Sequence, residues 1–327
     1  MQLVINSYGS YLHKEGERFV VKSEGKSAEV AADKVETILI TTSASLSTDA
    51  VALALERNVD IVFLDKFGDP MGRVWHSKLG STTRIRRWQL KAEETTEGFD
   101  LALGFVVRKA EQQIEFVKDL KKNRPGRADE FDAVLDEMKS LLSSLKGLKG
   151  TGNELRERVM GIEGMLSRKY FGVLSSSLPK KWQFEGRSRD PAKDGFNAML
   201  NYGYGVLYSH VERGCIVAGL DPYIGILHTD NYNKKSFVFD FIEIFRVPID
   251  RVVVNLFTKR QVKESYFDAV PGGVFLNKEG KVLLLTALNE MFEQKVRVGR
   301  RMVTFRSSIP LECHRVANKL LKEVRFR

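Results

Sequence analysis

Three acidic residues interrupt apolar segments of this chain, where a folded protein normally buries uncharged side chains. Glu163 lies on the apolar stripe of a predicted helix, and Asp240 and Glu243 interrupt an aromatic-rich run. A lone buried carboxylate costs roughly several kcal/mol unless it is paired, hydrogen-bonded or bound to a metal. Because His228 lies between these acids in the sequence, the pattern predicts a site for a divalent cation.

The spacing of the acids suggests which metal they would bind. Asp240 and Glu243 are three residues apart, so on a helix their carboxylates project from one face and repel each other unless a cation or protons lie between them. Carboxylate oxygens suit Mg²⁺ or Mn²⁺, and the imidazole of His228 favours Mn²⁺ or leaves the choice open. Asp230 is a candidate to orient that imidazole.

Each of these residues also has a purely structural explanation. Glu163 could be a helix-edge glutamate that pairs with Arg168, and a lone histidine is more often a core group than a ligand. The other two acids could be neutralised by basic residues close in sequence, namely Arg246, Lys234 and Lys235. The chain has no His-Glu-x-x-His or paired Cys-x-x-Cys metal motif, no P-loop and no serine elbow.

The excess positive charge of the chain is unevenly distributed. The net charge is +10, but residues 1–90 hold 12 Lys and Arg against 11 Asp and Glu, so most of the excess follows them. Such asymmetry indicates a polyanionic partner, DNA or RNA, or a negatively charged membrane surface. Basic, amide and phenol side chains that could contact phosphates or stack on bases are Arg168, Asn197, Tyr204, Lys234, Lys235 and Arg246.

The elements that must position these residues divide the chain into two parts. Short apolar runs with turn signals between them predict a small β-sandwich in the first quarter. From about residue 97 the apolar period becomes helical, and one long helix from about residue 192 ends before Gly219. We therefore expect an α+β protein with a β-rich domain over residues 1–78, a linker over 79–96 and a larger all-α catalytic domain over 97–327.

The composition also restricts the compartment. Cys215 and Cys313 are too few for a disulfide framework. The start of the sequence lacks a signal-peptide pattern, and no apolar span is long enough to cross a bilayer. We expect a cytoplasmic protein without a membrane segment.

Four motifs, taken in their order, resemble the CRISPR-associated spacer-acquisition integrase and endonuclease, the first-numbered core protein of the Cas adaptation machinery. The motifs are Gly161–Gly164, Asp194–Tyr204, Leu227–Asp230 and Phe239–Arg246. The strands of the first quarter resemble the opening domain of the same family, so the resemblance covers nearly the whole chain.

The resemblance implies a β-domain that mediates a homodimer and a helical catalytic domain in which Glu163, His228 and Glu243 bind the metal, with Asp240 beside them. The family often has aspartate where Glu243 stands, and glutamate keeps the oxygen ligand but lengthens its reach. A small dimeric partner, the second-numbered core Cas protein, is expected between two integrase dimers.

The chemistry implied by this resemblance is insertion of captured double-stranded DNA into a CRISPR array, for antiviral defence. A 3′-hydroxyl of the fragment would attack a phosphodiester at the repeat boundary, with Mg²⁺ or Mn²⁺ as Lewis acid. A divalent-metal nuclease without an integration role would use the same residues. A non-enzymatic DNA-binding protein, in which the acids only form ion pairs, is the second alternative.

Overall fold

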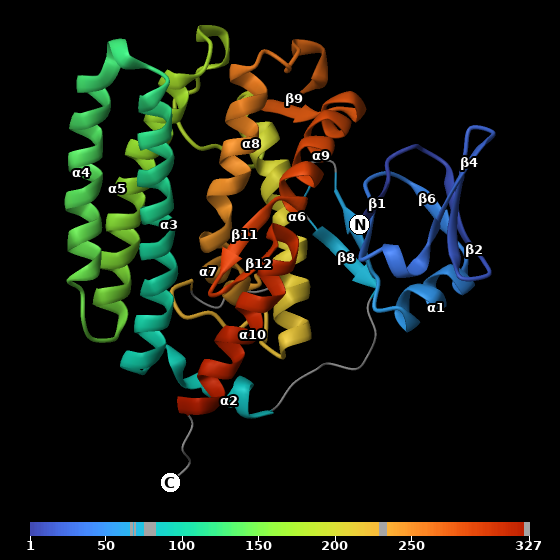
Figure 1. The fold of residues 1–327 in the computed structure, drawn as a ribbon, viewed down its shortest axis with the longest axis horizontal. Helices are drawn as coiled ribbons and strands as arrows, with labels where there is room; N and C mark the ends of the chain where they lie inside the picture. Colours follow the sequence, from blue (N-terminus) through green and yellow to red (C-terminus); the bar gives the residue numbers. More distant parts are fainter. Residues whose placement is uncertain (66–67, 69, 75–82, 229–233, 324–327) are drawn as a thin grey trace.

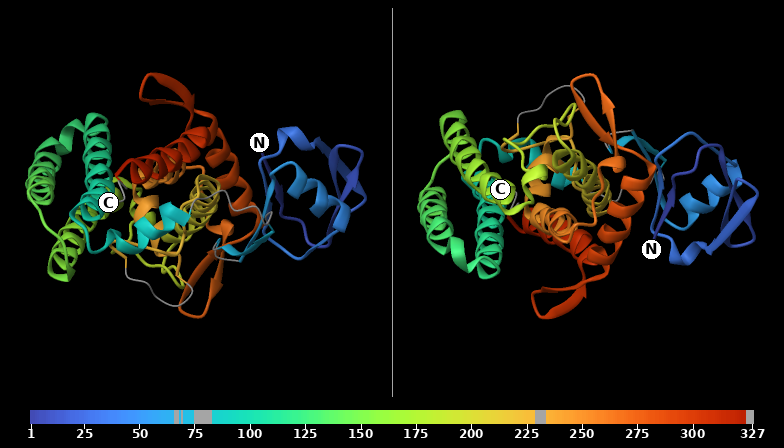
Figure 2. Two further views of the ribbon diagram at one scale, coloured as in Figure 1. Left: turned by 90° about the horizontal axis from the view of Figure 1, so that it is seen from below. Right: turned by 90° about the horizontal axis from the view of Figure 1, so that it is seen from above.

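The computed structural model describes the chain apart from residues 66–67, 69, 75–82, 229–233 and 324–327. A small β-rich domain lies at one end of an elongated molecule, and a larger, mostly helical domain forms the rest (Figures 1 and 2). The predicted α+β fold, with a β-domain followed by a helical domain, is confirmed.

The N-terminal domain is built from two four-stranded sheets. In the first sheet, ordered β1-β5-β7-β8, only β8 is antiparallel to its neighbour; the second sheet has the order β4-β3-β2-β6. Apolar side chains from both sheets, among them Leu12, Phe19 and Ile38, are fully buried in a separate core. The strands are β1 (Gln2–Ile5), β2 (Ser10–Glu15), β3 (Arg18–Ser23), β4 (Lys26–Ala31), β5 (Thr37–Ile40), β6 (Ala44–Leu46), β7 (Asp60–Leu64) and β8 (Pro70–Val74).

One helix, α1 (Thr48–Glu56), completes this domain. It begins where the side chain of Ser47 accepts a hydrogen bond from the backbone N–H of Ala50, as an N-cap serine does. Its buried face, which includes Leu53, packs into the same core, so the sequence between β6 and β7 connects the two sheets without leaving the domain.

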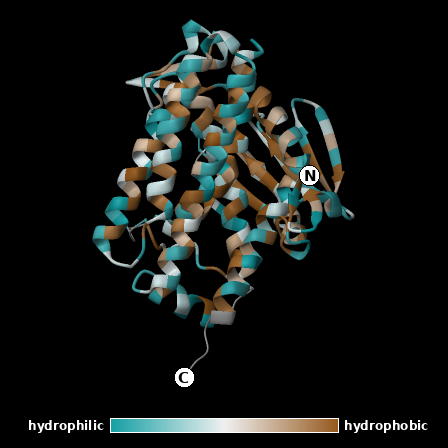
Figure 3. Ribbon diagram, turned by 60° about the vertical axis from the view of Figure 1, so that its left-hand side comes forward, coloured by the Kyte–Doolittle hydropathy of each residue, from teal (hydrophilic) through white to brown (hydrophobic). Residues whose placement is uncertain are grey.

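Long amphipathic helices form the second domain; apolar (brown) and polar (teal) residues alternate along them in Figure 3, and their buried apolar side chains share one core. Two β-hairpins that the apolar period did not predict accompany them: β9 (Phe267–Val270) with β10 (Gly273–Leu276), and β11 (Lys295–Val298) with β12 (Arg301–Thr304). The α-helices are α2 (Thr83–Ala92), α3 (Thr96–Lys122), α4 (Ala128–Lys146), α5 (Asn153–Ser177), α6 (Gly195–Ala218), α7 (Ser236–Ile242), α8 (Arg246–Thr258), α9 (Lys278–Glu293) and α10 (Phe305–Glu323).

Helix α6 is the centre of this domain. It begins at Asp194, whose carboxylate accepts a hydrogen bond from the Asn197 backbone N–H at 2.8 Å, and ends at Gly219, which adopts the left-handed conformation with φ of 85°. It contacts α7, α8, α9 and α10 and also strands β7 and β8 of the N-terminal domain. It therefore fixes the elements around the candidate site relative to the β-domain.

Part of the predicted linker over residues 79–96 is helical. Residues 79–82 lie outside the described part, and α2 follows directly. Gln89 of α2 is buried and both donates to the Asp221 carbonyl and accepts from the Asp221 N–H, so α2 packs on the helical domain. In the described ranges we find no helix long and apolar enough to span a membrane.

Candidate active site

The predicted site residues come from three separate segments and meet at one cavity of about 330 Å³. Glu163 is on α5, His228 follows the turn after α6, Asp240 is on α7, and Glu243 begins the short 3₁₀ turn Glu243–Phe245. The other side chains around this cavity include Arg189, Lys234 and Arg246. The fold thus brings all four residues together beside three cationic side chains.

Asp240 holds the backbone and the ring of His228. Its carboxylate is buried and accepts hydrogen bonds from three consecutive backbone N–H groups, those of Ile226, Leu227 and His228, at 2.6, 3.0 and 3.0 Å. The same carboxylate lies 2.6 Å from Nδ1 of His228. A carboxylate in this arrangement orients a histidine, leaving Nε2 as the nitrogen for a ligand. Asp230, the predicted orienting residue, lies outside the described residues.

Glu243 is an ionised carboxylate between two buried cations. Its Oε2 lies 2.5 Å from Nζ of Lys109 on α3, and its Oε1 lies 3.0 Å from Nη1 of Arg246. Burial raises the pKa of Glu243, but the charges of Arg246 and Lys109 outweigh this and lower the pKa to about 2. The side chain therefore carries its negative charge at any physiological pH.

Glu163 is held by the same lysine. Its Oε1 pairs with Nζ of Lys109 and accepts a hydrogen bond from the Ser167 hydroxyl, one helical turn later, at 2.7 Å. The side chain is 22% exposed, so one part of the carboxylate faces the cavity. The expected structural partner Arg168 is exposed, and Lys109 takes the place that the sequence suggested for it.

The two acids of α7 and its 3₁₀ turn do not share a cation, contrary to what their spacing suggested. Asp240 is satisfied by backbone N–H groups and His228, whereas Glu243 pairs with Lys109 and Arg246. The difference arises because the chain before α7 turns back over Asp240. One of the basic neighbours that the sequence suggested, Arg246, does pair with Glu243. Another, Lys235, pairs with Glu212 at 2.6 Å and not with these acids.

The donor set suits a divalent cation, although the donors do not converge as they stand. Among the residues that the structure describes, no three His, Cys, Asp or Glu side chains are arranged to hold a metal ion. Two carboxylates and an oriented imidazole are nevertheless ligands of the kind that Mg²⁺ and Mn²⁺ accept. Oε2 of Glu243 is buried, and its negative charge is met by the ammonium group of Lys109 at 2.5 Å.

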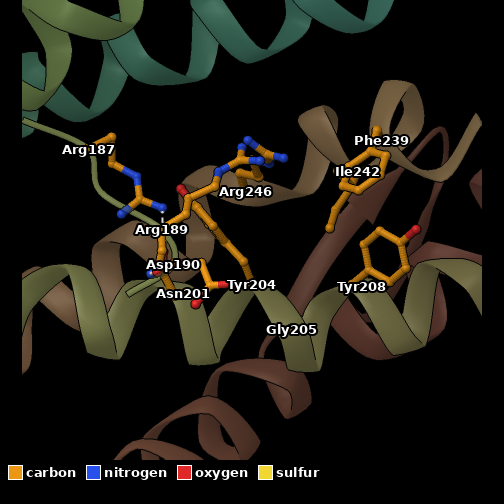
Figure 4. Close-up of a pocket in the computed structure, with 10 residues that line it drawn as sticks. All are labelled: Arg187, Arg189, Asp190, Asn201, Tyr204, Gly205, Tyr208, Phe239, Ile242 and Arg246. Carbon is orange, nitrogen blue, oxygen red and sulfur yellow. Dashed lines mark hydrogen bonds between the residues drawn. The ribbon is translucent and has the colours of Figure 1, made fainter. Parts of the chain in front are cut away.

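Arginine side chains extend the site along α6. A second cavity, of about 100 Å³, adjoins the first through Arg189 and Arg246, and Figure 4 shows these side chains with Arg187 above the helix that carries Tyr204 and Tyr208. The guanidinium groups of Arg187 and Arg246 lie 5.6 and 4.9 Å from the ring centre of Tyr204. Phosphate oxygens are the natural ligands of such a group.

The predicted DNA-contacting residues differ in how accessible and how free of protein partners they are. Lys234 lines the first cavity, and Arg246 and Tyr204 line the second, but Arg246 is already paired with Glu243 and Tyr204 donates to Asp250 at 2.5 Å. Asn197 is fully buried and donates to the Gly186 carbonyl. It positions the segment that carries Arg187 and Arg189 and is not open to DNA in this structure.

Lys109 is the site residue that sequence analysis missed. It lies three residues after Val106, with Ala110 and Gln113 also buried on the same helix. A lysine inside an apolar stripe is the same signal that singled out Glu163, so the pattern was present in the sequence. What the sequence does not show is that α3 and α5 place the two side chains opposite each other.

The chain thus combines a β-domain with a helical domain that holds acids and a histidine in a cavity beside arginines. The family model described as CRISPR associated protein Cas1 matches residues 3–290, and the chain belongs to this family. The CRISPR-associated endonuclease Cas1 1 of Archaeoglobus fulgidus is 35% identical, over 100% of this chain and 98% of the relative.

Solved structures share the fold at lower sequence identity. A Cas1 protein from Thermotoga maritima matches with a TM-score of 0.82 and 23% identity, over 100% of this chain and 99% of that one. A casposase bound to integration product matches with a TM-score of 0.82 and 22% identity, over 99% and 92%. A chain of a Cas6-RT-Cas1–Cas2 complex matches with a TM-score of 0.80 and 19% identity, over 99% and 35%.

Proposed function

We propose that this protein is a metal-dependent DNA integrase and endonuclease that inserts captured DNA fragments into a CRISPR array. The observation that carries the proposal is that four residues from distant segments line one cavity bordered by cationic side chains, namely Glu163, His228, Asp240 and Glu243. Membership of a family whose relatives are named endonucleases supports the same class of reaction.

The side chains of the site would have different roles in the reaction. Glu163, His228 and Glu243 would hold Mg²⁺ or Mn²⁺, which when bound supplies Lewis acidity toward a phosphoryl oxygen and a lower pKa for a hydroxyl or water. Asp240 keeps the His228 ring and its loop in place through four contacts. Arg189 and Lys234, both exposed at the cavity, are placed to neutralise the phosphates on either side of the reacting bond.

The reaction that fits this site is transesterification. The 3′-hydroxyl of the captured fragment loses its proton as its oxygen forms a new bond to phosphorus. The bond from phosphorus to the 3′-oxygen of the target strand breaks, and that oxygen takes up a proton, so the step is neutral in protons overall. No protein nucleophile is needed. Water in place of the hydroxyl would give hydrolysis at the same site, which accounts for endonuclease activity.

The expected assembly is a homodimer through the β-domain, with a small dimeric Cas2-type partner and double-stranded DNA. Support comes from the fold shared with a chain of a complex named for Cas1 and Cas2, and with a casposase bound to integration product. The positive net charge of the chain favours the same DNA partner.

A strand-transfer assay tests the proposal. A short duplex with free 3′-hydroxyl ends is mixed with a supercoiled plasmid that bears the repeat, with Mn²⁺, Mg²⁺ or chelator. Metal-dependent joining is expected for the wild type and for His314→Ala, whose histidine is exposed on α10, and loss of joining is expected for His228→Ala.

The two alternatives give different results in this assay. Nicking without joining, even with the small Cas partner added and with 3′-hydroxyl ends supplied, would identify a nuclease without an integration role. DNA binding without reaction in any metal would identify an architectural protein whose acids only form ion pairs.

A further inference from the structure

Lys109 places a positive charge between two of the expected metal ligands. The side chain belongs to α3, its residue is only 6% exposed, and Nζ pairs with Oε1 of Glu163 and lies 2.5 Å from Oε2 of Glu243. These are two carboxylates that the proposed function assigns to Mg²⁺ or Mn²⁺. A cation of the protein itself thus stands between the acids that are expected to hold the divalent cation.

The charges of this cluster balance without a metal. Glu163 and Glu243 supply two negative charges, and Lys109 and Arg246 supply two positive charges at contact distance. Adding a divalent cation to these four side chains would leave them with a surplus of two positive charges, which the carboxylate of Asp240 beside His228 offsets only in part. Such a surplus is unfavourable where Lys109 and Glu243 are buried, so binding of the metal favours the departure of one protein cation.

Of the two cations, Lys109 is the one that can leave. Arg246 is fixed by its pair with Glu243 and by its guanidinium position 4.9 Å from the ring centre of Tyr204. Lys109 ends in a single rotatable ammonium group and lines a neighbouring cavity of about 190 Å³, which Gln113 and Asp250 also line. Glu163 and Arg246 line this cavity as well, so the ammonium can move into it toward Gln113 and Asp250, away from Glu243, over a short distance.

We propose that Lys109 is a built-in competitor of the divalent cation: its ammonium group keeps the two glutamates paired and the site neutral until a metal ion displaces it. This inference rests on the proposed function, because it takes Glu163 and Glu243 as metal ligands. It explains why no three ligand side chains converge in the described part of the chain. It also implies that affinity for the metal is set partly by α3, an element with no predicted ligand of its own.

Metal binding measured without DNA tests the proposal separately from catalysis. Isothermal titration of Mn²⁺ is carried out on the wild type, Lys109→Met, Glu163→Gln and Lys118→Met, the last being a matched change of a partly exposed lysine on the same helix. Removing the competitor should tighten Mn²⁺ binding by about tenfold or more, the effect of one lost ion pair of modest strength. Lys118→Met should bind as the wild type does, and Glu163→Gln should bind much more weakly.

The outcomes distinguish the two hypotheses. Unchanged or weaker binding in Lys109→Met, with binding still dependent on Glu163, would overturn the role of Lys109 and leave the proposed function standing. Absence of Mn²⁺ binding in both the wild type and Lys109→Met would overturn the metal-dependent function and this inference together.

Thermal unfolding is a second readout, because the two glutamates repel each other once Lys109 is replaced. Without metal, Lys109→Met should melt below the wild type, and Mn²⁺ should raise its Tm by more than it raises that of the wild type. Lys109→Gln, which keeps a polar end, is the second variant. A failure of both variants to fold even with Mn²⁺ present would show that Lys109 is structural and would overturn the proposal.

Discussion

Nδ1 of His228 lies 2.6 Å from Oδ1 of Asp240, a carboxylate that also accepts the backbone N–H groups of residues 226–228. One buried side chain therefore fixes both the path of the loop and the orientation of the imidazole at its end. We therefore expect Asp240 to act on the proposed chemistry through His228 and not by contact with the substrate. Its two oxygens are already used by these four contacts.

Replacing Asp240 with asparagine tests this positioning role. In Asp240→Asn an amide NH₂ faces backbone N–H groups that donated hydrogen bonds to the carboxylate oxygen, and two donors cannot pair. Strand transfer should therefore fall by about 10- to 100-fold, and the free energy of unfolding by about 1–3 kcal/mol. The control is Asp129→Asn, an exposed aspartate on α4. Activity and Tm are measured for both, together with Mn²⁺ affinity, which should weaken only in Asp240→Asn. Unchanged Mn²⁺ affinity with reduced activity would argue against the role through His228.

Glu163 should matter for the reaction and not for DNA binding. We expect Glu163→Gln to lower strand transfer by roughly 100-fold or more, because an amide is a poor ligand for a hard cation, and to leave the Kd for DNA within about twofold. Glu157→Gln, an exposed change on the same helix, should alter neither. Filter binding and the joining assay measure the two effects. A loss of DNA affinity in proportion to activity would remove Glu163 from the metal site.

Local patterns in the sequence predicted two of the helices that form the site. The helical period identified α5 and α6, and Gly219 ends α6 in the left-handed conformation that favours glycine at this position. Alternating short strands predicted the β-domain. The hairpins after α8 were not predicted because their strands are only four residues long and partly exposed, which gives little apolar alternation.

The partners of the site residues depend on tertiary contacts that no local pattern encodes. Neighbours in the sequence suggested Arg168 for Glu163 and Asp230 for His228. The structure pairs them with Lys109 and Asp240, which lie 54 and 12 residues away. The distance along the chain, and not the type of residue, is what made these pairs unpredictable.

The exposed cations at the cavity should govern the salt dependence of DNA binding. Arg189→Ala should weaken DNA binding by a similar factor for any sequence and should reduce the slope of log Kd against log salt by about 1, the value expected for one lost phosphate contact. Lys139→Ala, on the outer helix α4, is the control and should leave the slope unchanged. DNA-binding titrations at several salt concentrations measure this slope. An unaltered slope for Arg189→Ala would show that Arg189 does not contact a DNA phosphate.

Arg73 of β8 connects the two domains through buried charges. Its Nη2 lies 3.2 Å from both Asp60 of β7 and Glu212 of α6, and Lys235, just before α7, lies 2.6 Å from the other oxygen of Glu212. Burial raises the pKa of Asp60 to about 6 in spite of the attraction of Arg73. The contact distance alone would suggest a stabilising ion pair. The raised pKa shows, however, that the desolvation of the ionised carboxylate outweighs its attraction to Arg73.

This balance predicts how stability changes with pH. Because the pKa of Asp60 is higher in the folded protein, about 6, than its ordinary value of 3.8, the folded state binds the proton more tightly. The contribution of Asp60 therefore destabilises the fold as pH rises from about 4 to about 6, by about 3 kcal/mol, and is constant above that range. In Asp60→Asn this loss is absent, so the variant should gain about 3 kcal/mol relative to the wild type between about pH 4 and about pH 7. Urea unfolding at pH 4 and at pH 7 measures the gain, with the exposed Asp33→Asn as control. A difference between variant and wild type that does not change with pH would show that folding does not raise the pKa of Asp60.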